Sequence, residues 1–303
     1  MRALLLLVAL LLAAPSPLSA QPRSEALPPL WVIRNETTTI HIFGTVHALP
    51  RGTPWFQRHV VEALDAADRL VLETIVPADP MAMMGVTLRM ARQARAVPLP
   101  QRVSPELLPT LAATLTRLNP GPLEHFKTWY VALTLANLAT SAAGLDPATG
   151  VEAVLTERAR LRKIPVEGLE TVEQQLTYFD VLSEADQRLF LEATLEDIAL
   201  ADARTQELID DWLAGRTDAL AQRLNRDFEG SPMLKQLLLG DRNARFADWI
   251  ATRLDSPGRV FVAIGAGHLA GPGNVLELLE RRGLKAERVM VEPPPARPTR
   301  RRG

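Results

Sequence analysis

The 303-residue chain contains no cysteine and carries almost no net charge. Without cysteine it can form no disulfide, no thiolate nucleophile and no cysteine-bound zinc site, so core packing alone must hold the fold together. A formal charge of −1 gives no general attraction to nucleic acid, and we expect no nucleic-acid partner. The only basic cluster lies in residues 293–303, which lack apolar side chains to bury and are predicted to form a disordered tail.

Two common hydrolase signatures are also missing. The sequence has no Gly-x-Ser-x-Gly elbow and no His-Glu-x-x-His helix, so it gives no support for a serine hydrolase or a zincin. Gly265 and Gly267 open a glycine-rich stretch, but its third glycine is too distant and His268 stands inside it. The stretch therefore does not indicate a dinucleotide-binding loop.

Residues 1–20 have the features of a secretory signal peptide. Arg2 gives a positive start, the apolar core from Ala3 to Ala14 is too short to span a bilayer, and Ala20 is a small residue at the expected cleavage point. An uncleaved membrane anchor is the alternative. We therefore expect an exported protein, periplasmic or secreted, with no stable membrane insertion after the signal is removed.

Residues 21–292 are expected to form one α/β domain. Apolar runs at 30–33 and 38–43 predict a hairpin, and a helix that begins at Pro54 leads to a strand over residues 70–74. A strand, a helix and a second strand within so few residues favour parallel strands.

Helical patterns dominate the rest of the chain. Helical insertions are predicted at about 79–150 and 183–254, with strands at 164–171, 259–264 and 288–291. The stretch 128–145 has no charge, but its threonine, asparagine and serine side chains favour a buried helix over a membrane span. The predicted architecture is a mixed, largely parallel β-sheet flanked by helices.

Polar side chains stand at four of the predicted strand ends. Two apolar runs close with the same pattern, Gly-x-x-His, which ends at His47 and at His268. Two others close with Leu-Glu-Thr, which places Glu73 and Glu170 at comparable positions. Ligands bind at this edge of open α/β sheets, so the four side chains could share one cleft although about 220 residues separate the two histidines.

Two imidazoles and two carboxylates form a ligand set that suits Mn, Fe, Co or Zn. Such an ion lowers the pKa of a bound water, and a carboxylate that is not on the metal can take the proton. Arg242, on a predicted helix, is a further candidate because a guanidinium can hold a carboxylate or stabilise an oxyanion. Each of these residues also has a purely structural interpretation. The histidines could cap loops, the glutamates could pair with arginines, and Arg242 could lie on a solvated helix face.

These motifs resemble those of the TraB/GumN family of exported bacterial proteins. The resemblance is carried, in chain order, by Phe43-Gly44-Thr45-Val46-His47, Leu70-Val71-Leu72-Glu73, Pro165-Val166-Glu167-Gly168-Leu169-Glu170-Thr171 with Gln175-Leu176, Asp241-Arg242-Asn243, and Val262-Ala263-Ile264-Gly265-Ala266-Gly267-His268-Leu269-Ala270-Gly271. That family is similar to the Tiki proteins, described as metal-dependent proteases. It is related more distantly to the erythromycin esterases and the ChaN haem-binding lipoproteins, which implies an EreA/ChaN-like fold.

The resemblance implies a metal-dependent hydrolase that acts on a peptide or protein substrate. It implies His47, Glu170 and His268 as the metal ligands and Glu73 and Arg242 as catalytic groups, although the residues leave open which glutamate is the ligand. The expected cofactor is a divalent metal, Mn²⁺ or Co²⁺ first, with Zn²⁺ or Fe²⁺ as alternatives. The alternative functions are a haem- or glycan-binding periplasmic module and a catalytically inert accessory protein.

Overall fold

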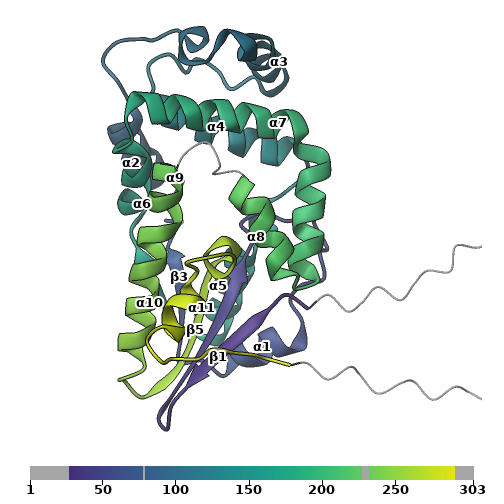
Figure 1. Cartoon of the computed structure of the whole chain (residues 1–303), viewed down its shortest axis with the longest axis vertical. Coiled ribbons are helices and arrows are strands. Elements are labelled where there is room, and N and C mark those ends of the chain that lie inside the picture. The colour runs from purple at the N-terminus through teal and green to yellow at the C-terminus, as the bar shows by residue number, and fades with distance from the viewer. Residues whose placement is uncertain (1–26, 78, 227–231, 291–303) are drawn as a thin grey trace, which may run out of the picture.

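The computed structural model describes residues 27–77, 79–226 and 232–290, and its centre is one six-stranded β-sheet (Figure 1). The strands lie in the order β4 (Val166–Glu170), β3 (Arg69–Thr74), β5 (Gly258–Gly265), β2 (Thr38–Thr45), β1 (Leu30–Arg34), β6 (Glu287–Arg288). The first four are parallel to one another, whereas β1 pairs antiparallel with β2 and with β6. This confirms the predicted mixed, largely parallel sheet. The predicted signal peptide 1–20 and the predicted tail 293–303 lie outside the described residues.

Two element boundaries and one strand pairing differ from the sequence-based expectation. Helix α1 (Arg58–Asp65) begins four residues after Pro54, because Trp55 is buried in the core and the residues around it form turns. Strands β2 and β3 are parallel as expected but do not pair, because β5 lies between them. Strand β6 is only two residues long within the described chain.

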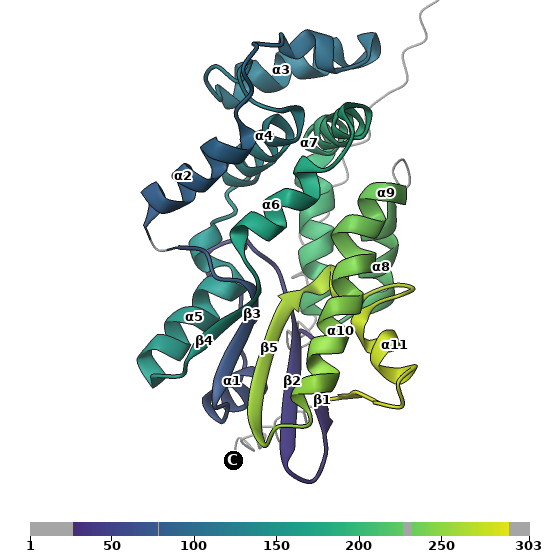
Figure 2. The same ribbon diagram turned by 90° about the vertical axis from the view of Figure 1, so that its left-hand side faces the viewer.

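The two faces of the sheet are covered by different helices, and alternation along the strands decides which residues face which helix. On one face Phe43, Leu72 and Phe261 pack with α1 and α5 (Val151–Arg162). On the other face the core formed with Ile42 and Val262 includes side chains of α10 (Asp241–Arg253) and α11 (Val275–Glu280) (Figure 2). Both faces of the central strands are therefore buried, which is typical of parallel sheets.

A layer of helices lies beyond one end of the sheet (Figure 1). Its α-helices are α2 (Pro80–Ala91), α3 (Leu108–Leu118), α4 (Thr128–Ala142), α6 (Val172–Asp180), α7 (Glu184–Leu213), α8 (Thr217–Arg226) and α9 (Pro232–Lys235). Short 3-10 turns occupy Leu99–Arg102, Pro105–Leu107 and Pro147–Thr149.

A third core joins the two insertions. The uncharged stretch forms α4, which packs with α3 and α7 around Val131, Leu135 and Leu195. Ser183 caps α7 by accepting a hydrogen bond from the backbone amide of Asp186, as expected for an N-cap. Within the described residues no helix is long and apolar enough to cross a membrane.

One buried arginine ties together the loops at the base of α4. The side chain of Arg102 is 1% exposed and donates to the carbonyl oxygen of Phe126 at 2.6 Å and to those of Val97 and Glu124, both at 2.8 Å. Burial lowers the pKa of this guanidinium. The Glu124 carbonyl also accepts from the amide of Val97 and from Gln93, whereas those of Val97 and Phe126 have Arg102 as their donor among the described residues, so we infer that Arg102 fixes the entry and exit of the first insertion.

We predict that Arg102→Met destabilises the protein by about 3 kcal/mol, because it leaves buried carbonyl groups without a donor. Urea unfolding followed by circular dichroism measures the change. Arg117→Met is the matched control, since Arg117 is exposed and makes one 3.5 Å contact, to the carbonyl oxygen of Ile198. Equal destabilisation by the two substitutions would contradict the structural role of Arg102.

Candidate functional site

The four predicted strand-end residues lie along one edge of the sheet, in the spatial order Glu170, Glu73, His268, His47. Glu170 is the last residue of β4 and Glu73 the penultimate residue of β3. His268 lies in the short turn Ala266–Leu269 directly after β5, and His47 follows the end of β2 by two residues. These four strands are neighbours in the sheet, and adjacent strands lie about 4.8 Å apart. Parallel strand pairing therefore gathers residues from both ends of the sequence.

The two Gly-x-x-His motifs are in direct contact. Thr45 and Gly265 pair in register between β2 and β5. A Cβ atom on Gly44 would lie 3.2 Å from the Cα of Ala266, so a larger residue at position 44 would push the second motif away. The buried indole of Trp212 donates to the carbonyl oxygen of Gly44 at 2.9 Å and fixes the first motif from the other side.

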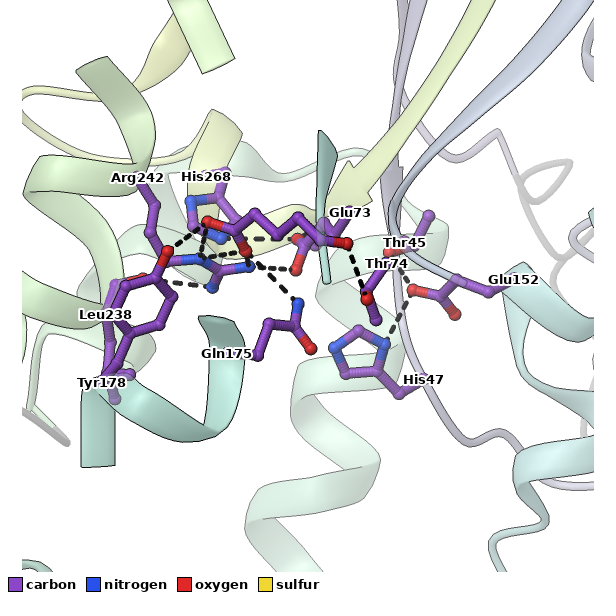
Figure 3. Close-up of polar contacts among 12 residues, drawn as sticks. Thr45, His47, Glu73, Thr74, Glu152, Gln175, Tyr178, Leu238, Arg242 and His268 are labelled. Carbon is purple, nitrogen blue, oxygen red and sulfur yellow. Dashed lines mark hydrogen bonds and ion pairs between the residues drawn. The ribbon is translucent and has the colours of Figure 1, made fainter. Parts of the chain in front are cut away.

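Arg242 binds both glutamates, and Figure 3 labels Arg242 and one of the two, Glu73. Its Nη2 is 2.5 Å from Glu73 Oε2 and 2.8 Å from Glu170 Oε2, and its Nε donates to Glu170 Oε2 at 3.0 Å. Glu170 also accepts from Tyr178 Oη and from Arg245 Nη2, each at 2.7 Å. Gln175 Nε2 donates to Glu170 Oε2 at 3.4 Å as well, so the carboxylate of Glu170 is held by four side chains of the protein itself.

A π-helical turn at Gln236–Gly240 leads into α10 and precedes Arg242 directly. The carbonyl oxygen of Leu238, within this turn, accepts from Arg242 Nη1 at 3.3 Å. Arg242 and Asn243 are consecutive in α10 and both buried, and they reach different groups of the site. Such turns are frequent at functional sites because they redirect side chains of the helix that follows.

These contacts keep both glutamates charged. Burial by itself would raise the pKa of Glu73, but the positive charge that His268 carries at low pH, together with Arg242 and the amide of Gly265, lowers it to about 2. Burial also opposes ionisation of Glu170, and Arg242 with Tyr178 and Arg245 holds its pKa below the ordinary value. Glu73 Oε1 accepts the Gly265 N–H at 2.5 Å, which couples β3 to the second motif.

His268 is neutral and has one defined tautomer. It is 3% exposed, and burial lowers its pKa to about 4. Asn243 donates through Nδ2 to the carbonyl oxygen of Gly273 at 2.9 Å, so its Oδ1 is the atom that accepts from His268 Nδ1 at 2.6 Å. The unprotonated Nε2 of His268 consequently faces Glu73 Oε1 at 3.4 Å. In the neutral imidazole this nitrogen and the carboxylate oxygen are both hydrogen-bond acceptors.

His47 occupies the open side of the same group. Its side chain is 75% exposed, and its Nδ1 donates to Glu152 Oε1 at 2.7 Å (Figure 3). Thr45 Oγ1 donates to the same oxygen at 2.5 Å. The hydrogen bond to Glu152 raises the pKa of His47, and the charges of Glu73 and Arg242 also act on it. His47 thus belongs to the electrostatic environment of the other three residues.

Sequence reasoning missed Glu152 and Tyr178, and it singled out Asn243 only as the neighbour of Arg242. Glu152 lies in the first turn of α5, where an acidic residue is ordinary, so its role was not visible. The tertiary structure brings Glu152 to His47, because the start of α5 lies against the His47 loop. A Cβ atom on Gly150 would lie 2.0 Å from the carbonyl oxygen of His47, so only glycine allows the helix to come this close. Asn243 adjoins Arg242 in the Asp-Arg-Asn motif, which was the one available signal for it.

The predicted metal ligands fit a divalent ion only in part. Among residues 27–77, 79–226 and 232–290, no group of three or more His, Asp or Glu side chains is close enough to hold a metal ion. The oxygens of Glu170 are engaged by arginines and a tyrosine. His268 and His47, by contrast, are each held through Nδ1 by an oxygen acceptor, which is the arrangement that supports metal-binding imidazoles. The ligand role of Glu170 and the catalytic roles of Glu73 and Arg242 remain predictions.

Comparison with known proteins gives one family. The model of the TraB/PrgY/gumN family matches residues 29–288. An uncharacterized protein of Treponema pallidum (strain Nichols) is 25% identical over 271 residues, which cover 84% of this chain and 80% of that protein. The uncharacterized protein YbaP of Escherichia coli (strain K12) is 26% identical over 242 residues, which cover 79% of this chain and 87% of that protein. No solved structure matches the chain.

We predict that Arg242→Met destabilises the protein by about 3–5 kcal/mol, because it leaves two buried carboxylates side by side without their shared cation. Arg245→Met is the matched control, since Arg245 has a side chain that is 47% exposed and binds only one of the two carboxylates. Its expected cost is about 1 kcal/mol. Chemical unfolding measures both values, and a similar loss for the two variants would contradict the bridging role of Arg242.

We also predict that Glu152→Gln lowers the pKa of His47 toward its ordinary value, because the substitution removes the negative partner. A raised pKa stabilises the fold at low pH, and this contribution is lost as pH rises through the folded-state pKa of about 9. The stability loss between about pH 6.5 and 9 should therefore shrink in the variant. NMR titration of the imidazole in chelator-treated protein measures the pKa. Glu157→Gln, on the exposed side of the same helix, should leave it unchanged.

Proposed function

The chain belongs to the TraB/PrgY/gumN family, and from the chemistry of its sheet edge we propose that it is an exported metal-dependent hydrolase that cleaves peptide bonds. The observation that carries the proposal is the pair formed by His268 Nε2 and Glu73 Oε1. These atoms face each other at 3.4 Å, both are acceptors, and both residues are buried. A lone pair and a charged oxygen in this arrangement favour a cation between them.

The chemistry of the pair suits a small divalent ion. Such an ion would accept the lone pair of His268 Nε2 and neutralise the carboxylate of Glu73. Nitrogen and carboxylate ligands without thiolates suit Mn²⁺ or Co²⁺, with Zn²⁺ and Fe²⁺ as alternatives. The charge balance also allows an ion, because Arg242 already compensates Glu170 from the opposite side.

We propose that His268 and Glu73 hold the ion between them, and that His47, which does not form a group of three with them among the described residues, moves toward the ion when it binds. Glu170 is then the anchor of Arg242, which differs from the sequence-based assignment of Glu170 as ligand and Glu73 as base. Asn243 and Glu152 are the outer partners that fix the two imidazoles through Nδ1.

When bound, the ion would polarise the scissile carbonyl and lower the pKa of a water molecule. The protein's own groups would supply orientation and charge. Arg242, held by both glutamates, keeps a positive charge beside the edge, where negative charge develops on the substrate oxygen. Because His47 is exposed, a peptide can reach the edge from its side.

Elemental analysis and calorimetric titration with Mn²⁺ and Co²⁺ test the site. We predict one ion per chain for the unaltered protein, and at least tenfold weaker binding for His268→Ala and for Glu73→Gln, because each removes one ligand. Glu170→Gln should still bind one ion, which separates the two glutamates. His125→Ala is the matched control, since His125 is exposed and distant in the sequence from every site residue.

Hydrolysis of a peptide library with and without the ion tests the activity. Cleavage that depends on the ion and disappears in His268→Ala is the expected result. An unaltered protein that binds no divalent ion would refute the metal site, and ion binding without cleavage of any peptide would refute the peptidase.

A further inference from the structure

Helix α2 places apolar side chains on the surface instead of in a core. Met81 is 65% exposed, Met84 47% and Leu88 37%, and their spacing puts them on one side of the helix. Among the α2 residues whose side chains are described, only Ala91 is buried. An apolar helix is normally covered by its own protein, and none of the residues that the structure describes covers α2 on this side.

The segment between β3 and α2 also exposes apolar side chains, and these reach the sheet edge. Ile75 and Val76 are 47% and 64% exposed, and they follow Thr74, the last residue of β3. Glu73 is therefore only two residues from an exposed apolar side chain. We name the residues Ile75, Val76, Met81, Met84 and Leu88 the α2 face.

In residues 79–105 every charged side chain is an arginine except Asp79, which caps the N-terminus of α2. Arg89, Arg92 and Arg95 are exposed, and no aspartate or glutamate occurs in residues 80–105. None of these three arginines forms a salt bridge with another described residue. Apolar side chains bordered by unpaired arginines complement a surface that is itself apolar and anionic.

We propose that the α2 face binds the surface of a lipid bilayer that contains anionic lipids. The helix lies at the periphery of the helical layer, beside α6 (Figure 2), so it can rest on a flat surface without rearrangement of the fold. Methionine and leucine would enter the boundary between headgroups and acyl chains, and the arginines would contact lipid phosphates. Contact through this face would bring the edge that carries Glu73 close to the bilayer.

The absence of cysteine allows a local test. The full chain with the single substitution Met84→Cys is labelled with an environment-sensitive fluorophore and mixed with vesicles of phosphatidylcholine alone or with 30% phosphatidylglycerol, a composition of roughly physiological anionic content. A blue shift and a severalfold rise in emission with the anionic vesicles is the expected result. The matched control is Leu161→Cys, since Leu161 is a 61% exposed apolar residue on α5, outside the α2 face. Its label should not respond.

Combined substitution of Arg89, Arg92 and Arg95 by glutamine in the labelled protein should weaken binding by about fivefold for each arginine removed. Circular dichroism confirms that the variants fold. An unresponsive Met84 label, or equal responses of the two labels, would overturn the proposal. So would a response that depends on protein concentration and not on vesicles, because that result identifies a second copy of the chain as the partner. None of these measurements depends on metal binding or hydrolysis, so they test the α2 face independently of the proposed function.

Discussion

The guanidinium of Arg242 holds the candidate site together. It is buried with two carboxylates from neighbouring strands, which without it would repel each other in a poorly solvated environment. The same helix places Asn243 against His268, so one short segment of α10 fixes both a charge and an imidazole tautomer. The helical insertion that ends in α10 is thereby tied to the sheet edge.

Backbone contacts set the distances within that edge. Gly44 lets the two Gly-x-x-His motifs touch, and Gly150 lets the N-terminus of α5 reach the His47 loop. In both places a Cβ atom would meet main-chain atoms of the neighbouring segment. Glycine is needed there for space, because both residues lie where a side chain would separate two parts of the site.

The site and the α2 face are consecutive in the chain. Strand β3 ends with Glu73 and Thr74, and the exposed Ile75 follows at once. The buried carboxylate of Glu73 and the first exposed apolar side chains of the α2 face are therefore only a few residues apart in the chain. If both proposals hold, the protein would act on peptide segments near a membrane surface, with its catalytic edge oriented by α2.

The sequence by itself determined the α/β class, the largely parallel sheet, most strand positions and the family, because apolar runs closed by Gly-x-x-His or Leu-Glu-Thr are local patterns. It also named four residues that the sheet brings to one edge. The tertiary structure decided their partners: β5 lies between β2 and β3, Glu170 pairs with Arg242, and Glu152 holds His47. These contacts join segments far apart in the chain, and no local pattern records which carboxylate meets the arginine and which meets the imidazole.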